Sequence, residues 1–378
     1  MTEPVLVVIF LRGGADGLHL ICPSADTDLI AARAPDLRVA RKGDKAGFVL
    51  QDQAADVDFR FHPQAKGLSE LFGAGELAVV HAAGLTDGTR SHFDAEDKME
   101  RASAVSTTGG WLGRWLANQE PDGPLPALAV GDSAPESLRG GGGVPVAGAL
   151  DDLILPAGHE LSHMIGQSMM DGFAAHPLIG PQISKLVGLS GLLSDRLTDP
   201  DTGERPNYRP DVKYPKGPLA QSLQTIAHAL KLDLGLRIAT ADYGGWDTHI
   251  NQAGDFAKRT RHLSQALMAF WRDLGDRREH VTVVVMSEFG RRLRSNTAGG
   301  TDHGYGNAMM IVGGNVKGGQ MLGAWPGLQN EALAQGADLA ITTDYRQVLA
   351  EVLRTHMKTP DLSPIFPDFA DDPLGLFA

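Results

Sequence analysis

The chain of 378 residues is long enough for one large α/β domain or two smaller ones. Its 42% hydrophobic and 21% charged residues are typical of a globular protein, and its formal net charge of -12 argues against nucleic acid or an anionic membrane as the main partner. The single cysteine, Cys22, excludes an internal disulfide and any zinc site with two thiolates, and no apolar run is long enough to predict a membrane-spanning helix.

The first predicted element is Val5–Leu11, a continuous apolar run typical of a central parallel strand that is buried on both faces. No basic, cleavable leader precedes it, so the sequence as given predicts no export signal and leaves the compartment open. The strand is followed by Gly13 and Gly14, which allow a sharp turn and the close approach of a carboxylate or phosphate. Asp16 follows, although an ordinary strand-to-loop turn is the simpler explanation when this residue is taken alone.

A second strand is predicted at Leu77–Ala82, after a helix at Leu68–Ala74. It leads to Ser91, just before a predicted helix at Ala95–Ala102. A serine there suits a nucleophile, because free backbone N–H groups and the helix dipole favour an anion. It suits a helix N-cap better when taken alone. The neighbouring His92 has no assigned role.

The pattern loosens from residue 119 to residue 218, where glycine and proline interrupt it repeatedly. A short helix is predicted at Gly109–Asn118, another at Pro177–Asp195, and a polar, proline-rich loop at Asp199–Pro218. We therefore predict a single α/β domain over residues 1–378, with residues 119–218 as an insertion or cap over the sheet edge that shapes the pocket.

Regular patterns return in the last part of the chain. Helices are predicted at Leu219–Leu232, Ala253–Arg272 and Gln347–Met357, and strands at Leu236–Ala241, Val281–Met286 and Ala308–Val312. This alternation indicates a mostly parallel sheet covered by helices. Polar residues follow two of these strands: Asp247 and His249 come after Leu236–Ala241, and Glu288 comes after Val281–Met286. The turn between the last two strands contains Asp302 and His303.

These polar clusters follow the carboxyl ends of predicted strands, where open α/β sheets bind their ligands. Carboxylates, imidazoles and one hydroxyl suit a divalent ion such as zinc or manganese. Such an ion would lower the pKa of a bound water or serine hydroxyl and stabilise charge on a phosphoryl or sulfuryl oxygen. Arg12, Arg90 and Arg291 lie beside the clusters and could clamp an anion, although a surface salt bridge is the simpler role for each.

Several segments, taken together, give the chain a resemblance to a known family. They are LRGGADGLH, RSHFDAEDKME, GGWDTH, MSEFGRR and GGTDHG, followed by TDYRQVLAEVL. In this order they resemble the DUF1501 family, which groups with the alkaline phosphatase/sulfatase superfamily, and the resemblance spans essentially the whole chain. It implies an alkaline-phosphatase-like three-layer α/β sandwich with metals at the carboxyl edge of a mostly parallel central sheet. It also implies hydrolysis of phosphate or sulfate esters by a Ser, Thr or formylglycine nucleophile.

By this resemblance, Asp16 takes the place of the first metal ligand and Ser91 that of the nucleophile. Asp247 with His249 matches the metal-binding Asp/His motif, and His303 matches the last metal-binding histidine. Conversion of Ser91 to formylglycine by the Cys-directed route is not expected, because the residue is not a cysteine.

Two departures from the superfamily pattern leave the metal content open. The usual Asp-x-x-x-His motif is shortened here to Asp247-x-His249, and Glu288-Phe289 stands where an Asp-His pair is expected, so one imidazole is missing. The chain would then bind one metal, bind a second mainly through oxygen ligands, or lack catalysis. His19 or His92 could replace the missing imidazole, and nothing in the sequence places either one.

Two hypotheses follow. The first is a hydrolase of small anionic esters that uses one or two divalent ions (zinc, manganese, calcium or iron). Its residues would be Ser91 as nucleophile, Arg90 or Arg291 as anion clamps, and Asp16, Asp247, His249, Glu288, Asp302 and His303 around the metal. The second is a non-catalytic binding or assembly protein that works with a companion protein. A serine esterase is disfavoured, because the sequence has no G-x-S-x-G elbow.

Overall fold

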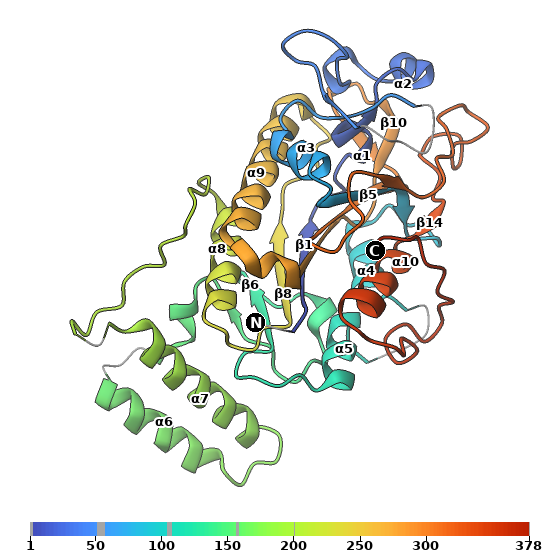
Figure 1. Cartoon of the computed structure of the whole chain (residues 1–378). Helices are drawn as coiled ribbons and strands as arrows, with labels where there is room; N and C mark the ends of the chain where they lie inside the picture. Colours follow the sequence, from blue (N-terminus) through green and yellow to red (C-terminus); the bar gives the residue numbers. More distant parts are fainter. Residues whose placement is uncertain (1–2, 51–56, 104–107, 156–158, 200, 378) are drawn as a thin grey trace.

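The computed structural model describes residues 3–50, 57–103, 108–155, 159–199 and 201–377 (Figure 1). The strands of the central sheet are β1 (Val5–Leu11), β5 (Leu77–Gly84), β6 (Ala127–Val130), β7 (Val146–Ala147), β8 (Ile238–Tyr243), β9 (Val281–Met286), β12 (Asn307–Gly313), β13 (Met321–Leu322) and β14 (Thr343–Asp344). Two smaller sheets contain β10 (Arg291–Ser295) with β11 (Thr301–His303), and β2 (Ile21–Pro23) with β3 (Phe48–Val49) and β4 (Phe59–Phe61).

The central sheet has the order β13-β5-β12-β9-β1-β8-β6-β7, with β14 also paired to β5. Its pairs are parallel except those of β12, which runs antiparallel to both β5 and β9. The predicted α/β class with a mostly parallel central sheet is therefore confirmed.

Helices cover both faces of this sheet. The helices among the described residues are α1 (Gly17–Leu20), α2 (Thr27–Ala32), α3 (Lys66–Gly73), α4 (His92–Arg101), α5 (Trp111–Gln119), α6 (His159–Phe173), α7 (Gly180–Leu197), α8 (Pro218–Lys231), α9 (Gln252–Asp273) and α10 (Tyr345–Glu351). Alternate residues of β1 point to opposite faces, so Val7 packs with the α3, α8 and α9 side and Val8 with the α4, α5 and α10 side (Figure 1). This two-sided burial explains the continuous apolar run of the strand.

The predicted elements agree with the observed ones to within three residues, and β1 and β9 have the predicted bounds. The last predicted helix is divided into α10 and a π-helical turn, Val352–His356. Within residues 119–218, the predicted insertion or cap, β6 and β7 belong to the central sheet. Residue 200, in the loop predicted at 199–218, lies outside the described residues. Among those described, no helix is both long and apolar enough to cross a bilayer.

Candidate metal centre

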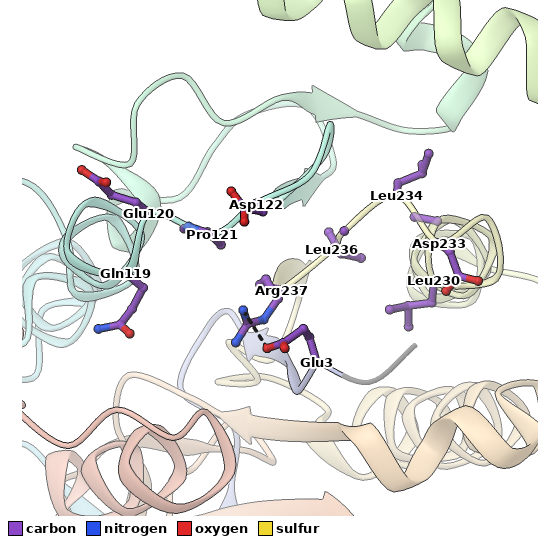
Figure 2. Close-up of a pocket in the computed structure, with 12 residues that line it drawn as sticks. Glu3, Gln119, Glu120, Pro121, Asp122, Leu230, Asp233, Leu234, Leu236 and Arg237 are labelled. Atoms are coloured by element: carbon purple, nitrogen blue, oxygen red, sulfur yellow. Dashed lines mark ion pairs between the residues drawn. The ribbon is translucent and has the colours of Figure 1, made fainter.

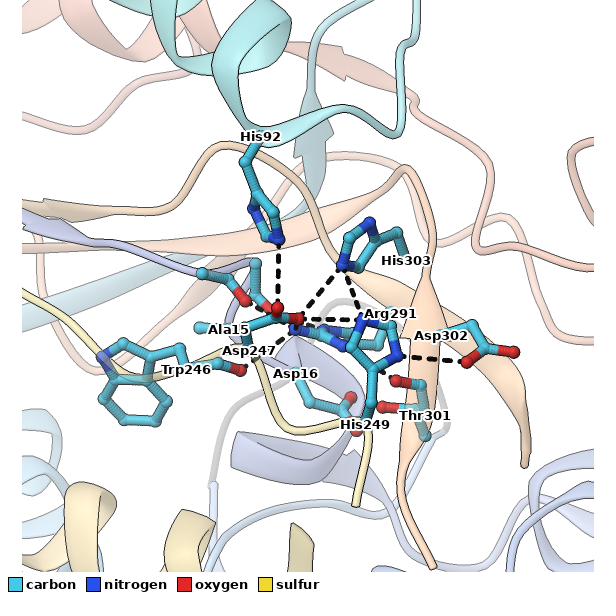
Figure 3. Close-up of polar contacts among 12 residues, drawn as sticks. Ala15, Asp16, His92, Trp246, Asp247, His249, Arg291, Thr301, Asp302 and His303 are labelled. Carbon is cyan, nitrogen blue, oxygen red and sulfur yellow. Dashed lines mark hydrogen bonds and ion pairs between the residues drawn. The ribbon is translucent and has the colours of Figure 1, made fainter. Parts of the chain in front are cut away.

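Four side chains, His92, Asp247, His249 and His303, meet at the carboxyl edge of the sheet (Figure 3). His92 begins α4 after the loop that leaves β5, the pair Asp247 and His249 lies in the loop after β8, and His303 ends β11. Because β12 runs back antiparallel to β9, the β10–β11 hairpin that connects them stays at this edge.

The three imidazoles point their Nε2 atoms toward the same carboxylate. Asp247 Oδ1 lies 3.0 Å from His249 Nε2 and 3.1 Å from His303 Nε2. Asp247 Oδ2 lies 3.5 Å from His92 Nε2, a buried nitrogen that has no hydrogen-bond partner. One ligand atom each from His92, Asp247 and His303 lies within 4.8 Å of the others. The carboxylate-to-nitrogen distances of 3.0, 3.1 and 3.5 Å are close to the roughly 3.4 Å that separates two ligands of a tetrahedral ion with bonds of about 2.1 Å.

The other ring nitrogen of each histidine is held by a protein acceptor. The Nδ1 pairs are His92 with Glu288 Oε1 at 2.7 Å, His249 with Asp302 Oδ1 at 3.1 Å, and His303 with the carbonyl oxygen of Arg90 at 2.8 Å. An imidazole that donates its Nδ1–H to such an acceptor keeps the lone pair on Nε2, which is the tautomer that binds a metal. The donor set therefore fits one divalent ion.

Arg291 fixes the carboxylate at the centre. Its buried guanidinium donates from Nη2 to Asp247 Oδ1 at 2.7 Å. Burial alone would raise the pKa of Asp247, but hydrogen bonds from Arg291 and His303 outweigh it and lower that pKa to about 2. The other N–H groups of Arg291 donate to the carbonyl oxygens of Gly13, Gly14, Trp246 and Thr301. This arginine was predicted to bind substrate, but the protein itself occupies its donors.

Glu288 lies behind His92 and is fully buried. Its Oε1 accepts from the backbone N–H of Gly13 at 2.8 Å as well as from His92. This is the close approach expected of the glycine turn, since a Cβ at Gly13 would lie 2.5 Å from the backbone nitrogen of Asp247. The hydrogen bond to Glu288 raises the pKa of His92. Burial lowers the pKa of His303 despite its own hydrogen bonds. The predicted metal ligand Glu288 is thus a hydrogen-bond partner of His92.

Ser91 lies between two residues that contact the cluster, Arg90 through its carbonyl group and His92 through its ring. It occupies the N-cap position of α4, but its hydroxyl makes no capping hydrogen bond, and the residue is exposed. The side chain of Arg90 points to Asp338, with Nε 3.0 Å from Oδ2, and stacks on the ring of Tyr305. The neighbour of the predicted nucleophile is therefore already paired.

Asp16 is not brought into the cluster. It is fully buried, pairs with Arg33, and accepts from Gln252 Nε2 at 2.7 Å. His19 stacks on Phe256 with ring centroids 4.5 Å apart, and its burial lowers its pKa to about 3. Both residues belong to the protein interior, so of the two histidines considered for the missing imidazole, His92 lies in the cluster and His19 does not.

A cavity of about 550 Å³ lies at the opposite edge of the sheet, beside the starts of β1 and β8 (Figure 2). Its acidic lining includes Asp122 and Asp233, and Arg237 there pairs with Glu3 at 3.3 Å. No histidine of the described chain lines it. This cavity and the clustered imidazoles therefore lie at opposite edges of the sheet.

The structure brings three of the predicted metal ligands, Asp247, His249 and His303, close together. Asp302 does not contact Asp247 in this cluster but is the partner of His249 Nδ1. From the sequence, His92 is only a possible replacement for the missing imidazole. Its position directly after Ser91 is the one feature of the sequence that points to it. Its proximity to Asp247 depends on the placement of α4 beside the loop after β8, which the sequence does not give.

Several solved structures are similar to this chain at low scores. The C-terminal periplasmic domain of EcEptC from Escherichia coli, in complex with Zn, has a TM-score of 0.36 and 6% identity over 83% of this chain and 74% of that one. The PsFucS1 sulfatase from a Pseudoalteromonas species has a TM-score of 0.33 and 12% identity over 85% of this chain and 64% of that one. Alkaline phosphatase from the Antarctic bacterium TAB5 has a TM-score of 0.35 and 8% identity over 94% of this chain and 99% of that one. These scores give no basis for assigning an activity.

No curated protein matches the sequence. A family model, "Protein of unknown function (DUF1501)", matches residues 196–364. This segment contains Asp247, His249 and His303, together with Arg291 and Asp302, so most of the cluster lies inside the matched region. Through residues 196–364, a little under half of its length, the chain is similar to the DUF1501 family.

Proposed function

We propose that the chain binds one divalent metal ion through His92, Asp247, His249 and His303 and hydrolyses phosphate or sulfate esters at that site. The observation that carries the metal proposal is the shared orientation of the three imidazoles, whose Nε2 atoms face Asp247 while every Nδ1 has a protein acceptor. Three nitrogens and one carboxylate oxygen suit zinc or iron better than calcium, which prefers an all-oxygen set.

A bound ion would act as a Lewis acid that activates a hydroxyl and stabilises charge on the ester group. Ser91 is the proposed nucleophile, because its exposed hydroxyl is unused by the helix cap and lies beside His92. Its Oγ would bond to phosphorus or sulfur as the bond to the alcohol oxygen breaks, and the alcohol would leave with the serine proton. Water would then hydrolyse the ester on Ser91 and restore the hydroxyl.

A second function, metal-dependent binding without catalysis, is favoured by one observation. Arg90 and Arg291, the arginines expected to hold the ester oxygens, already pair with Asp338 and Asp247. Without a free guanidinium from either residue, an anionic substrate would be held mainly by the ion. If the chain binds without catalysis, we propose that a companion protein binds at this edge of the sheet.

Elemental mass spectrometry of the chain, purified without chelator or a nickel column, tests the metal site. We expect close to one ion per chain in the wild type and almost none in His92→Ala or His303→Ala. His163→Ala is the matched control, because it removes an exposed imidazole of α6 and should leave the metal content unchanged. A folded wild type that takes up no zinc, iron or manganese on soaking would disprove the metal site.

The ester proposal needs its own measurement. Hydrolysis of aryl phosphates and aryl sulfates by the metal-loaded wild type should fall to background in Ser91→Ala, which should keep its ion. Full metal content with no hydrolysis in the wild type would favour the binding function. Equal turnover by Ser91→Ala would remove the serine from the reaction and leave metal-activated water as the nucleophile.

A further inference from the structure

Helices α6 and α7 form a hairpin that projects from the body of the molecule, at the end of the sheet away from the histidine cluster (Figure 1). The two helices pack closely at Gly166, where a Cβ would lie 2.8 Å from a methyl carbon of Val187. Seven of the twelve exposed large hydrophobic side chains among the described residues lie between Leu161 and Leu186. The exposed apolar surface is thus concentrated on this hairpin.

The outer face of α6 carries a stripe with a regular spacing. Leu161, Ile165, Ser168 and Gly172 follow one another at intervals of four, three and four residues, and all four are exposed. Met164 lies beside this stripe with 65% of its surface exposed, and Leu161 is 54% exposed. The intervals are those of the contact seam of a two-helix coiled coil, in which one face of each helix is buried by its partner.

We propose that this stripe is a homodimer interface in which α6 packs antiparallel against α6 of a second copy. A two-fold axis that passes between Gly166 and Gln167 places each residue opposite the residue that lies equally far on the other side of the axis. Leu161 then faces Gly172 of the second copy, and Ile165 faces Ser168. Each large side chain meets a small one, and a two-fold axis requires this kind of self-complementary surface. The same sequence supplies both halves of the match.

The charge of the helix also favours a second copy over a membrane. Between residues 161 and 173 the one charged residue is Asp171, on a chain with a formal net charge of -12. A face that meets its own copy must avoid like charges, and this is a nearly neutral part of an acidic protein. An interfacial membrane helix typically carries lysine or arginine on its polar face. Residues 161–173 contain neither.

The size of the helix sets the expected strength. The 15 residues of α6 span about 22 Å, at 1.5 Å per residue. An antiparallel pair of helices of this length lies at the lower end of specific interfaces, which bury about 1,000 Å² in total. We therefore expect a reversible dimer with a micromolar dissociation constant.

Sedimentation velocity of the full chain over a concentration series tests the proposal. The wild type should reach twice the monomer mass at tens of micromolar, whereas Ile165→Glu should stay at the monomer mass with an unchanged circular dichroism spectrum. Val49→Glu is the matched control, because Val49 is also an exposed apolar residue (49%) but lies on β3. A monomeric wild type, or an Ile165→Glu variant that still dimerises, would overturn the proposal.

Disulfide trapping tests the predicted register. The double variant Leu161→Cys with Gly172→Cys should form a covalent dimer on mild oxidation, since facing positions of this seam suit a disulfide. Either single variant should not, because its two copies would lie about 16 Å apart along the helix. The natural Cys22 is buried and does not compete. A wild type that binds anionic liposomes as a monomer, and loses this binding in Ile165→Glu, would assign the stripe to a membrane and refute the dimer.

Discussion

His92, His249 and His303 differ in how firmly their Nδ1 atoms are held. His92 is bound by the fully buried Glu288, whereas His249 is bound by Asp302, whose side chain is half exposed. Carboxylates that hold a ligand in this way raise its basicity and fix its orientation. The sequence could not separate such a carboxylate from a metal ligand, because both have the same residue type and lie at the same sheet edge.

Asp302→Asn measures this difference. We expect the variant to keep one ion per chain but to bind it about 10- to 100-fold more weakly, because the amide carries no charge to support His249. Competition with a chromophoric chelator gives the affinity. Asp36→Asn, an exposed carboxylate outside the cluster, should bind as the wild type does. Complete loss of the ion in Asp302→Asn would instead make Asp302 a direct ligand, as the sequence suggested.

The proline-rich segment before α8 shows at the element scale how a loop without helix or strand is fixed in place. Asp273, at the end of α9, accepts from the hydroxyls of Tyr208 and Tyr214 at 2.7 and 3.0 Å and from the backbone N–H of Asp211 at 3.0 Å. Lys231 of α8 donates to it at 2.8 Å. Burial would raise the pKa of Asp273, but these hydrogen bonds lower it overall.

Asp273→Asn should lower the free energy of unfolding by roughly 3 kcal/mol near neutral pH, because it removes the charge of a buried carboxylate that accepts hydrogen bonds from Tyr208, Tyr214 and Lys231. A carboxylate whose pKa is depressed by folding stabilises the protein above its unfolded pKa, about 3.9, and loses that effect as the pH falls through the folded value. The gap between wild type and variant should therefore be full above about pH 5 and shrink below pH 4.

Urea denaturation at several pH values measures this gap. The matched control is Asp276→Asn, because Asp276 is an exposed carboxylate three residues further on. Its unfolding free energy should follow that of the wild type at every pH. A gap for Asp273→Asn that does not change with pH would show that the ionised carboxylate is not the stabilising group.

Arg291 connects distant parts of the chain at the scale of the whole molecule. Its guanidinium bonds to the turn after β1, the loop after β8, and β11, so residues 13, 247 and 301 share one donor group. A buried charge that bridges three segments is costly to remove, because its acceptors are left without donors. The fold and the cluster therefore depend on the same side chain.

Arg291→Met should lower the free energy of unfolding by about 3–5 kcal/mol and also lower the metal content. Thermal unfolding and elemental analysis of the same samples measure the two effects. Arg294→Met, at an exposed arginine of the same strand, should change the unfolding free energy by no more than about 0.5 kcal/mol. A stable, metal-loaded Arg291→Met protein would contradict the bridging role.

The α/β sheet and the edge at which the polar residues gather could be predicted from the sequence alone. Continuous apolar runs such as Val5–Leu11 predict buried parallel strands from local composition alone, and the polar residues that follow them must lie at one sheet edge. For this reason Asp247, His249 and His303 could be grouped without coordinates. The spacing and residue type of these positions carry the necessary information.

The contacts among these groups at that edge could not be predicted from the sequence. Ligand and supporting residue differ by a few ångströms and by the direction of a ring nitrogen, and these depend on contacts between segments far apart in the chain. His92 joined the cluster, Glu288 and Asp302 moved behind it, and Asp16 paired with Arg33 in the interior. The exposed stripe of α6 was equally hidden in the sequence, because an apolar helical pattern does not say whether its second face is covered.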